Sequence, residues 1–171
     1  MSDTVLVTGA TGYIALHVVQ QLLDGGYKVR ATVRNPDDAE KTKALRDLAA
    51  NAPERLDVVK GDLLDAECWP NHVTGCAYVM HTASPFPMVN PKNADDVIRP
   101  AVDGTLNVLR ACNGKVKRVV LTSSIAAIVG GHDAPPNGCT FNEDVWSQPN
   151  DDSTVYHTKK YCREIHGTII D

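Results

Sequence analysis

The chain has 171 residues, the size of a single globular domain. Its residues are 43% hydrophobic and 22% charged, which excludes a disordered or collagen-like chain. The 17 Lys and Arg against 21 Asp and Glu give a net charge of −4, so we expect no nucleic-acid partner. No apolar run approaches the roughly 18 residues of a membrane-spanning helix, so we expect no membrane segment. The first predicted strand begins at Val5, which leaves no room for a secretory signal.

The cysteines predict the compartment. They are five in number, with no C-x-x-C pair, and the chain has no N-x-S/T glycosylation sequon. These features favour a reducing, intracellular environment, so we expect a cytoplasmic protein. The six histidines lack the spacing of metal ligands, and we predict no metal site.

Short apolar runs alternate along the chain with segments of helical periodicity. Strands are predicted over residues 5–8, 28–34, 56–60, 77–82 and 117–123. Helices are predicted over 13–23, from 35–37 to about 50, over 93–112 with a kink at Pro100, and from 153 to about 169. The strands are continuously apolar, which is typical of a parallel sheet covered on both faces. We therefore predict the α/β class with a doubly wound parallel sheet.

The first strand leads into a glycine-rich turn, T-G-A-T-G-Y-I-A, over residues 8–15. Gly9 and Gly12 allow the backbone to approach a pyrophosphate closely, and the helix N-terminus supplies unpaired N–H groups. This strand–turn–helix context predicts dinucleotide binding at Gly9, Thr11, Gly12, Tyr13 and Ile14. The alternative is a glycine turn that only connects two elements.

The end of the second strand predicts which dinucleotide binds. Arg34 lies 22 residues after Gly12, where an NAD-binding fold carries an acidic residue for the ribose hydroxyl. An arginine there can instead bind a 2′-phosphate, and Lys41 adds a second positive charge. We therefore predict NADP as the cofactor. The alternative is that both residues are ordinary solvated charges.

Polar residues also follow the third and fourth predicted strands. Asp62 could accept a hydrogen bond from the adenine amino group, or it could cap a helix. The segment after the fourth strand is expected to lie along the nicotinamide half of the cofactor, because ligands bind at the carboxyl ends of parallel strands. The cofactor residues predicted in these two segments are Asp62, Leu63, Thr82, Ala83 and Ser84.

Tyr156 and Lys160 lie four residues apart on the last predicted helix and therefore on one face of it. A free phenol has a pKa of about 10, and a nearby ammonium lowers that pKa toward the neutral range in which a proton can be exchanged. Ser123 and Ser124 end the fifth strand, where a hydroxyl can hydrogen-bond a substrate carbonyl. Spacing alone does not separate the two serines. An exposed helix pair and a serine-capped loop are the alternatives.

Together these segments resemble the extended short-chain dehydrogenase/reductase family, within it the dihydroflavonol reductase, cinnamoyl-CoA reductase and methylglyoxal reductase group. The resemblance is carried by V-L-V-T-G-A-T-G-Y-I-A, R-A-T-V-R-N-P, V-K-G-D-L-L-D, H-T-A-S-P-F, G-T-L-N-V-L-R-A-C, R-V-V-L-T-S-S and Y-H-T-K-K. It implies a Rossmann fold that binds NADPH and passes hydride to an aldehyde or ketone. It also implies that Tyr156 donates the proton and Ser124 polarises the carbonyl, while Lys160 lowers the tyrosine pKa and, with Tyr156, contacts the cofactor.

The chain departs from this group in two places. Cinnamoyl-CoA reductases carry N-W-Y-C-Y around the tyrosine, whereas residues 153–157 read S-T-V-Y-H, which argues against that substrate. Residues 165–171 also leave the family pattern, and members continue with a sixth strand and a substrate-binding lobe. We therefore expect residues 1–171 to form an NAD(P)-binding domain without that lobe, whose substrate is a small-molecule carbonyl compound. The alternatives are a non-catalytic NADP-binding module and a nucleotide-sugar epimerase or dehydratase.

Overall fold

The computed structural model describes residues 2–85, 95–129, 131–134, 138, 140–142 and 144–148. The chain divides into two compact units. The first comprises residues 1–84 and 106–122, and the second comprises residues 85–105 and 123–171.

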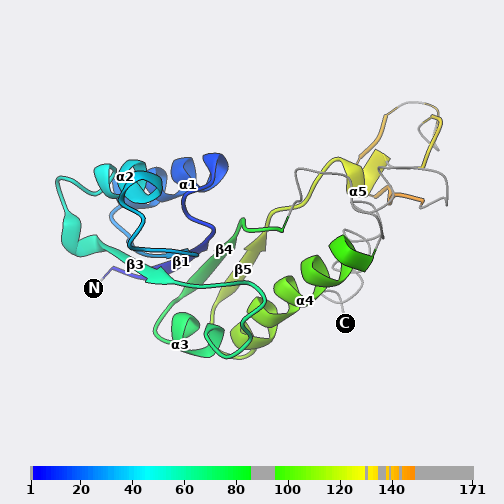
Figure 1. Ribbon diagram of the computed structural model, residues 1–171. Coiled ribbons are helices and arrows are strands. Elements are labelled where there is room, and N and C mark those ends of the chain that lie inside the picture. The colour runs from blue at the N-terminus through cyan, green and yellow to red at the C-terminus, as the bar shows by residue number, and fades with distance from the viewer. Residues whose placement is uncertain are drawn as a thin grey trace. The chain divides into compact units, whose positions relative to one another are not determined.

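The first unit is built on a parallel sheet of five strands in the order β3-β2-β1-β4-β5 (Figure 1). The strands are β1 (Thr4–Thr8), β2 (Lys28–Val33), β3 (Leu56–Lys60), β4 (Tyr78–His81) and β5 (Arg118–Leu121). The chain starts in the centre of the sheet, adds two strands on one side and then crosses to the other. This confirms the predicted doubly wound sheet and puts its switch point between β1 and β4, where such sheets bind ligands.

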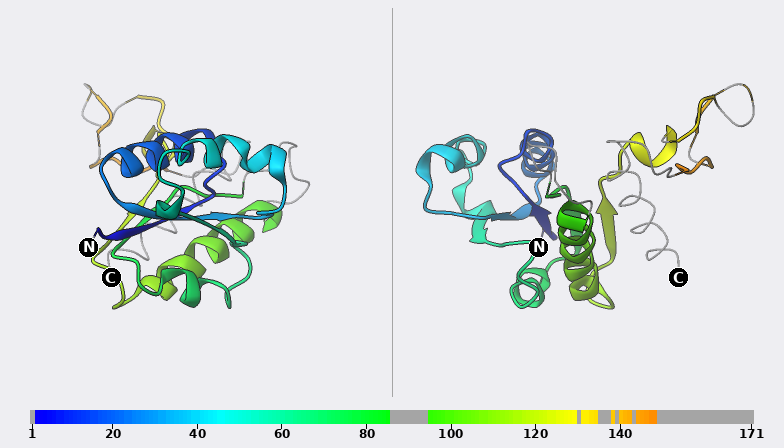
Figure 2. Two further views of the ribbon diagram at one scale, coloured as in Figure 1. Left: turned by 90° about the vertical axis from the view of Figure 1, so that its left-hand side faces the viewer. Right: turned by 45° about the vertical axis from the view of Figure 1, so that its right-hand side comes forward.

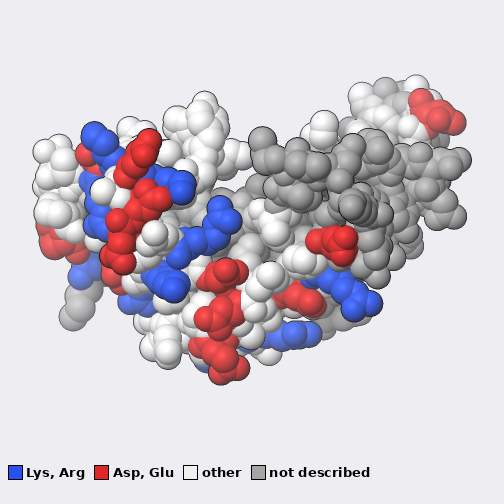
Figure 3. All heavy atoms as spheres, in the orientation of Figure 1, with Lys and Arg blue, Asp and Glu red and all other residues white. Residues whose placement is uncertain are grey.

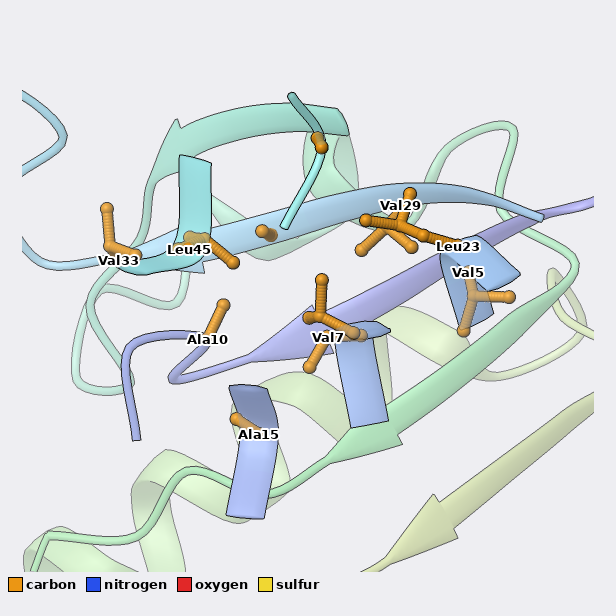
Figure 4. Close-up of a cluster of buried hydrophobic side chains, with 11 residues drawn as sticks. Val5, Val7, Ala10, Ala15, Leu23, Val29, Val33 and Leu45 are labelled. Atoms are coloured by element: carbon orange, nitrogen blue, oxygen red, sulfur yellow. The ribbon is translucent and has the colours of Figure 1, made fainter. Parts of the chain in front are cut away.

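Helices cover both faces of this sheet. The helix α1 (Tyr13–Asp24) and the helix α2 (Ala39–Asp47) lie on one face, and α3 (Trp69–Val73) and the C-terminal part of α4 (Asp95–Cys112) lie on the other (Figures 1 and 2). Side chains from β1, β2, α1 and α2 meet in one core cluster, in which Leu45 and Val7 are fully buried (Figure 4). A second cluster contains Leu6, Trp69, Val79 and Val108.

The second helix begins later than predicted. The sequence indicated a start at residues 35–37, but α2 begins at Ala39, because Asp38 is its N-cap and accepts the backbone N–H of Lys41 at 3.1 Å. The side chain of Asn35 accepts the N–H of Asp37 at 3.1 Å, so the preceding residues form a turn. The helix also ends at Asp47, before the predicted residue 50.

Three short elements were not predicted: the 3₁₀ turn Pro53–Arg55, α3, and α5 (Ala126–Val129). Each has five residues or fewer, too few for a helical periodicity. The predicted glycine end of α1 is confirmed, since Gly25 is its C-cap and Gly26 follows with φ +82°. Pro100 lies inside α4, as predicted. The predicted helix over 153–169 lies outside the described residues.

The second unit contains the first part of α4 and the short helix α5. The N–H of Ser147 donates to the carbonyl of Ala127 at 2.8 Å, and Nε2 of His132 donates to the carbonyl of Trp146 at 2.8 Å. Across the described ranges, the structure contains no helix with both the length and the apolar character that a bilayer span requires.

Candidate cofactor-binding site

The turn between β1 and α1 brings two backbone segments into contact. Gly9 has φ +64°, a left-handed conformation that favours glycine. A Cβ on Gly9 would lie 2.9 Å from Cβ of Ala83, which follows β4. Real Cβ atoms do not approach so closely, so only glycine fits between β1 and the segment after β4. Two of the predicted cofactor residues are thus brought together.

The N-terminus of α1 is open. Gly12 is its N-cap and donates its N–H to the carbonyl of Gly9 at 2.9 Å, but no side chain caps the helix and its first turn has no acidic residue. The first N–H groups of a helix lack partners within the helix and carry a partial positive charge. The predicted residues Thr11, Tyr13 and Ile14 are all exposed around this end, and Tyr13 is 80% exposed. This geometry suits the binding of a phosphate group.

The hydroxyl of Thr8 joins the ends of β1 and β4. Its oxygen accepts the N–H of Thr82 at 3.1 Å and the N–H of Ala83 at 3.0 Å. The hydroxyl of Thr82 in turn donates to the carbonyl of Thr8. Thr8 and His81 are paired in the sheet register, and Nδ1 of His81 lies 2.7 Å from the Thr8 oxygen. The segment of Thr82 and Ala83 is therefore fixed to the strand that carries the glycine turn.

These contacts determine the protonation of His81. Two N–H donors already occupy the acceptor sites of the Thr8 oxygen, so its O–H donates to Nδ1 of His81 and the imidazole proton lies on Nε2. That Nε2 is buried and has no hydrogen-bond partner among the described residues. Burial disfavours the charged ring and lowers the pKa of His81 from 6.5 to about 4. His81 is therefore neutral at physiological pH.

Arg34 and Lys41 lie at the next strand end. Arg34 is exposed directly after β2, and Nζ of Lys41 pairs with Oδ2 of Asp38 at 2.9 Å. The hydrogen bond that the Lys41 ammonium donates to Asp38 raises the pKa of Lys41, whereas the positive charge of Arg34 acts in the opposite direction. The two cations are thus close enough to interact. Lys41 is nevertheless a paired cation rather than the independent charge that its place in the sequence suggested.

Asp62 and Leu63 follow β3 in the same unit. Oδ1 of Asp62 accepts the N–H of Leu64 at 2.9 Å, and its backbone carbonyl accepts Nε1–H of Trp69 at 3.1 Å. The helix-capping alternative for Asp62 is wrong, because the next helix begins only at Trp69. Leu63 packs against the second core cluster, and its carbonyl accepts a hydrogen bond from Asn107 at 2.9 Å. The contact of Asp62 with adenine and the contact of Leu63 with the cofactor stay predictions.

Of the three predicted catalytic residues, Ser124 alone lies in the described part of the chain, so their arrangement stays a prediction. Ser124 belongs to the second unit, where its carbonyl accepts the N–H of Ala127 at 2.9 Å. It is half-buried, whereas Ser123 is exposed. Tyr156 and Lys160 lie outside the described residues. Ser84 is exposed at the end of the first unit.

The fold and the glycine turn define a nucleotide-binding protein of the doubly wound α/β class. Residues 5–167 match the family described as the NAD dependent epimerase/dehydratase family, and the chain belongs to this family. This confirms the family resemblance found in the sequence.

The chain is similar to several reductases. Tetraketide alpha-pyrone reductase 1 of Arabidopsis thaliana is 44% identical over 147 residues, which cover 84% of this chain and 44% of that protein. Dihydroflavonol 4-reductase of Hordeum vulgare is 37% identical over 166 residues, which cover 96% of this chain and 43% of that protein. The solved structure of yeast methylglyoxal/isovaleraldehyde reductase Gre2 complexed with NADPH has a TM-score of 0.76 at 29% identity, covering 98% of this chain and 52% of that one. The chain thus spans about half the length of these relatives.

The close approach of Gly9 to Ala83 predicts an unequal effect of two glycine substitutions. Gly26 also has positive φ, but a Cβ there would meet nothing within 4 Å. Gly26→Ala should therefore cost only the conformational penalty of about 1 kcal/mol. Gly9→Ala should cost about 1–3 kcal/mol more, because it adds a collision with Ala83. Urea unfolding of both variants measures the difference, and equal destabilisation would contradict the contact.

The neutral, buried His81 predicts a loss of stability in mild acid. In the unfolded chain His81 takes up a proton below pH 6.5, whereas in the folded chain it does so only near pH 4. The free energy of unfolding should therefore fall by about 3 kcal/mol from this residue between those pH values. His81→Asn, whose side-chain oxygen can accept the Thr8 hydroxyl, should lack this loss, and His17→Asn at an exposed position should retain it. If the free energy of unfolding falls equally with decreasing pH in wild type and His81→Asn, the neutral state of the buried His81 is disproved.

Proposed function

We propose that the chain is the cofactor-binding part of an NADPH-dependent oxidoreductase that reduces an aldehyde or ketone. The observation that carries this proposal is the open N-terminus of α1, reached through a glycine that packs against Ala83. The absence of a Cβ at Gly9 and of a side-chain cap at Gly12 leaves backbone N–H groups available to a pyrophosphate. The residues present therefore fit a dinucleotide.

The two cations after β2 support the choice of NADPH over NADH. Arg34 can form a charge-assisted fork with the 2′-phosphate, and Lys41 adds a second donor from the first turn of α2. Position 34, directly after β2, holds this arginine instead of the acidic residue that would bind a free ribose hydroxyl. The yeast and Candida albicans Gre2 structures, 29% and 32% identical to this chain, are complexes with NADPH.

The proposed chemistry rests on the sequence of the second unit. Bound NADPH would supply a hydride to the carbonyl carbon and be oxidised to NADP⁺. Tyr156 would donate its phenolic proton to the carbonyl oxygen, so that the product is an alcohol. The ammonium of Lys160, four residues further along the predicted helix, would lower the phenol pKa. The hydroxyl of Ser124 would hydrogen-bond the same oxygen and stabilise its developing charge. Several relatives bear the names of reductases, which supports this reaction class.

Replacing Arg34 should separate the two cofactors. Arg34→Ala removes a charge-assisted hydrogen bond, so NADPH affinity should fall by about 10- to 100-fold while NADH affinity changes little. Lys43→Ala is the matched control, because Lys43 is a cation on α2 that pairs with Asp47 at 2.6 Å. Isothermal titration of the 171-residue chain with each nucleotide gives the dissociation constants. A wild-type chain that prefers NADH would refute the NADPH assignment.

Replacing the phenol should separate catalysis from binding. Tyr156→Phe should lower NADPH oxidation with a panel of aldehydes and ketones by about 10²- to 10⁴-fold and change the dissociation constant of NADPH far less, because the aromatic ring is kept. Tyr161→Phe removes a hydroxyl from the same predicted helix and should retain activity. Unchanged turnover in Tyr156→Phe would exclude the proposed role. A wild-type chain that binds NADPH but turns over no carbonyl would instead favour the non-catalytic module.

A further inference from the structure

Asp38 directs both carboxylate oxygens at a single residue, Lys41. Oδ1 accepts the backbone N–H of Lys41 at 3.1 Å and thereby caps α2, and Oδ2 pairs with its ammonium at 2.9 Å. The Lys41 side chain is 79% exposed and that of Asp38 is 25% exposed. Because an exposed ion pair is weak, the ammonium can leave Asp38 for a stronger anion. The first oxygen keeps its helix-capping role when that happens.

The carboxylate of Asp38 cannot easily move away with the departing ammonium. The N–H of Asp38 donates to the carbonyl of Asn35, and its own carbonyl accepts the hydroxyl of the buried Thr42 at 2.8 Å. The guanidinium of Arg46 donates to the carbonyl of Pro36 at 3.2 Å. These bonds tie the turn between β2 and α2 to the helix. A phosphate bound between Arg34 and Lys41 therefore has the Asp38 carboxylate as a fixed neighbour.

This region does not attract a phosphate through net charge. Residues 34–47 contain four basic and four acidic side chains, and Figure 3 shows both kinds intermixed over this part of the surface. The basic residues are Arg34, Lys41, Lys43 and Arg46, and the acidic residues are Asp37, Asp38, Glu40 and Asp47. Binding of a phosphate must therefore depend on individual contacts. Among the acidic residues, only Asp38 pairs with a cation assigned to the phosphate.

We propose that Asp38 competes with the 2′-phosphate of NADPH for the ammonium of Lys41 and so limits the preference of this chain for NADPH over NADH. The inference rests on the proposed function, because it needs the 2′-phosphate between Arg34 and Lys41. On binding, Lys41 exchanges the carboxylate for the phosphate, and the carboxylate is left beside a second anion. Asp38 is thus a specificity-determining residue that acts against the phosphorylated cofactor.

The test uses Asp38→Asn, which keeps an oxygen to accept the Lys41 N–H and removes the charge. The dissociation constants of NADPH and NADH are measured by isothermal titration with the 171-residue chain. NADPH should bind about 3- to 10-fold more tightly to Asp38→Asn than to wild type, while NADH binding stays unchanged. Asp38→Ser, which also caps a helix without charge, should give the same change.

Asp47→Asn is the matched control. It removes the same charge from the same helix and releases Lys43 from its pair, but Lys43 is not assigned to the phosphate. The preference of this variant for NADPH over NADH, taken from the two dissociation constants, should equal that of wild type. An unchanged or weaker preference for NADPH over NADH in the Asp38 variants, or an equal gain in that preference in Asp47→Asn, overturns the role of Asp38. Failure of the wild type to bind either nucleotide instead overturns the proposed function, and the inference falls with it.

Discussion

The hydrogen bonds of the Thr8 hydroxyl hold together the carboxyl ends of β1 and β4, and the proposed cofactor site depends on this junction. Thr8 and His81 are 73 residues apart in the chain, but they end two neighbouring strands in the sheet. By accepting two backbone N–H groups after β4, Thr8 holds Ala83 against Gly9. The glycine turn leads from this contact into α1, whose N-terminus has no side-chain cap. The proposed phosphate site thus lies directly beside the strand junction.

This junction also lowers the stability of the folded chain in one respect. To accept the Thr8 hydroxyl, His81 must be neutral and carry its proton on Nε2, where no described residue receives it. A buried donor without a partner typically costs about 1–3 kcal/mol. The gain is a backbone position at Thr82 and Ala83 that is fixed before any ligand binds. Pre-organised sites often contain such locally unfavourable groups.

Local patterns were enough to predict the strands, the glycine turn and the position of Arg34, because each depends on residues adjacent in the chain. The start of α2 was predicted wrongly, since Asn35-Pro36 is also typical of a helix start and only the structure shows that Asp38 is the cap. The pairing of Lys41 with Asp38 and the bond between Thr8 and His81 were not predicted. The first depends on where the helix begins, and the second depends on strand register across 73 residues. The roles of Ser124, Tyr156 and Lys160 remain predictions from the sequence.

Amide hydrogen exchange of the 171-residue chain, with and without saturating NADPH, tests the location of the site most directly. We expect slower exchange in two segments, residues 9–16 at the start of α1 and residues 34–42 at the start of α2. NADH should protect the first segment and leave the second nearly unchanged, because it lacks the 2′-phosphate. NADPH binding without protection of residues 9–16 would contradict the account, because the open N-terminus of α1 would then not be the phosphate site.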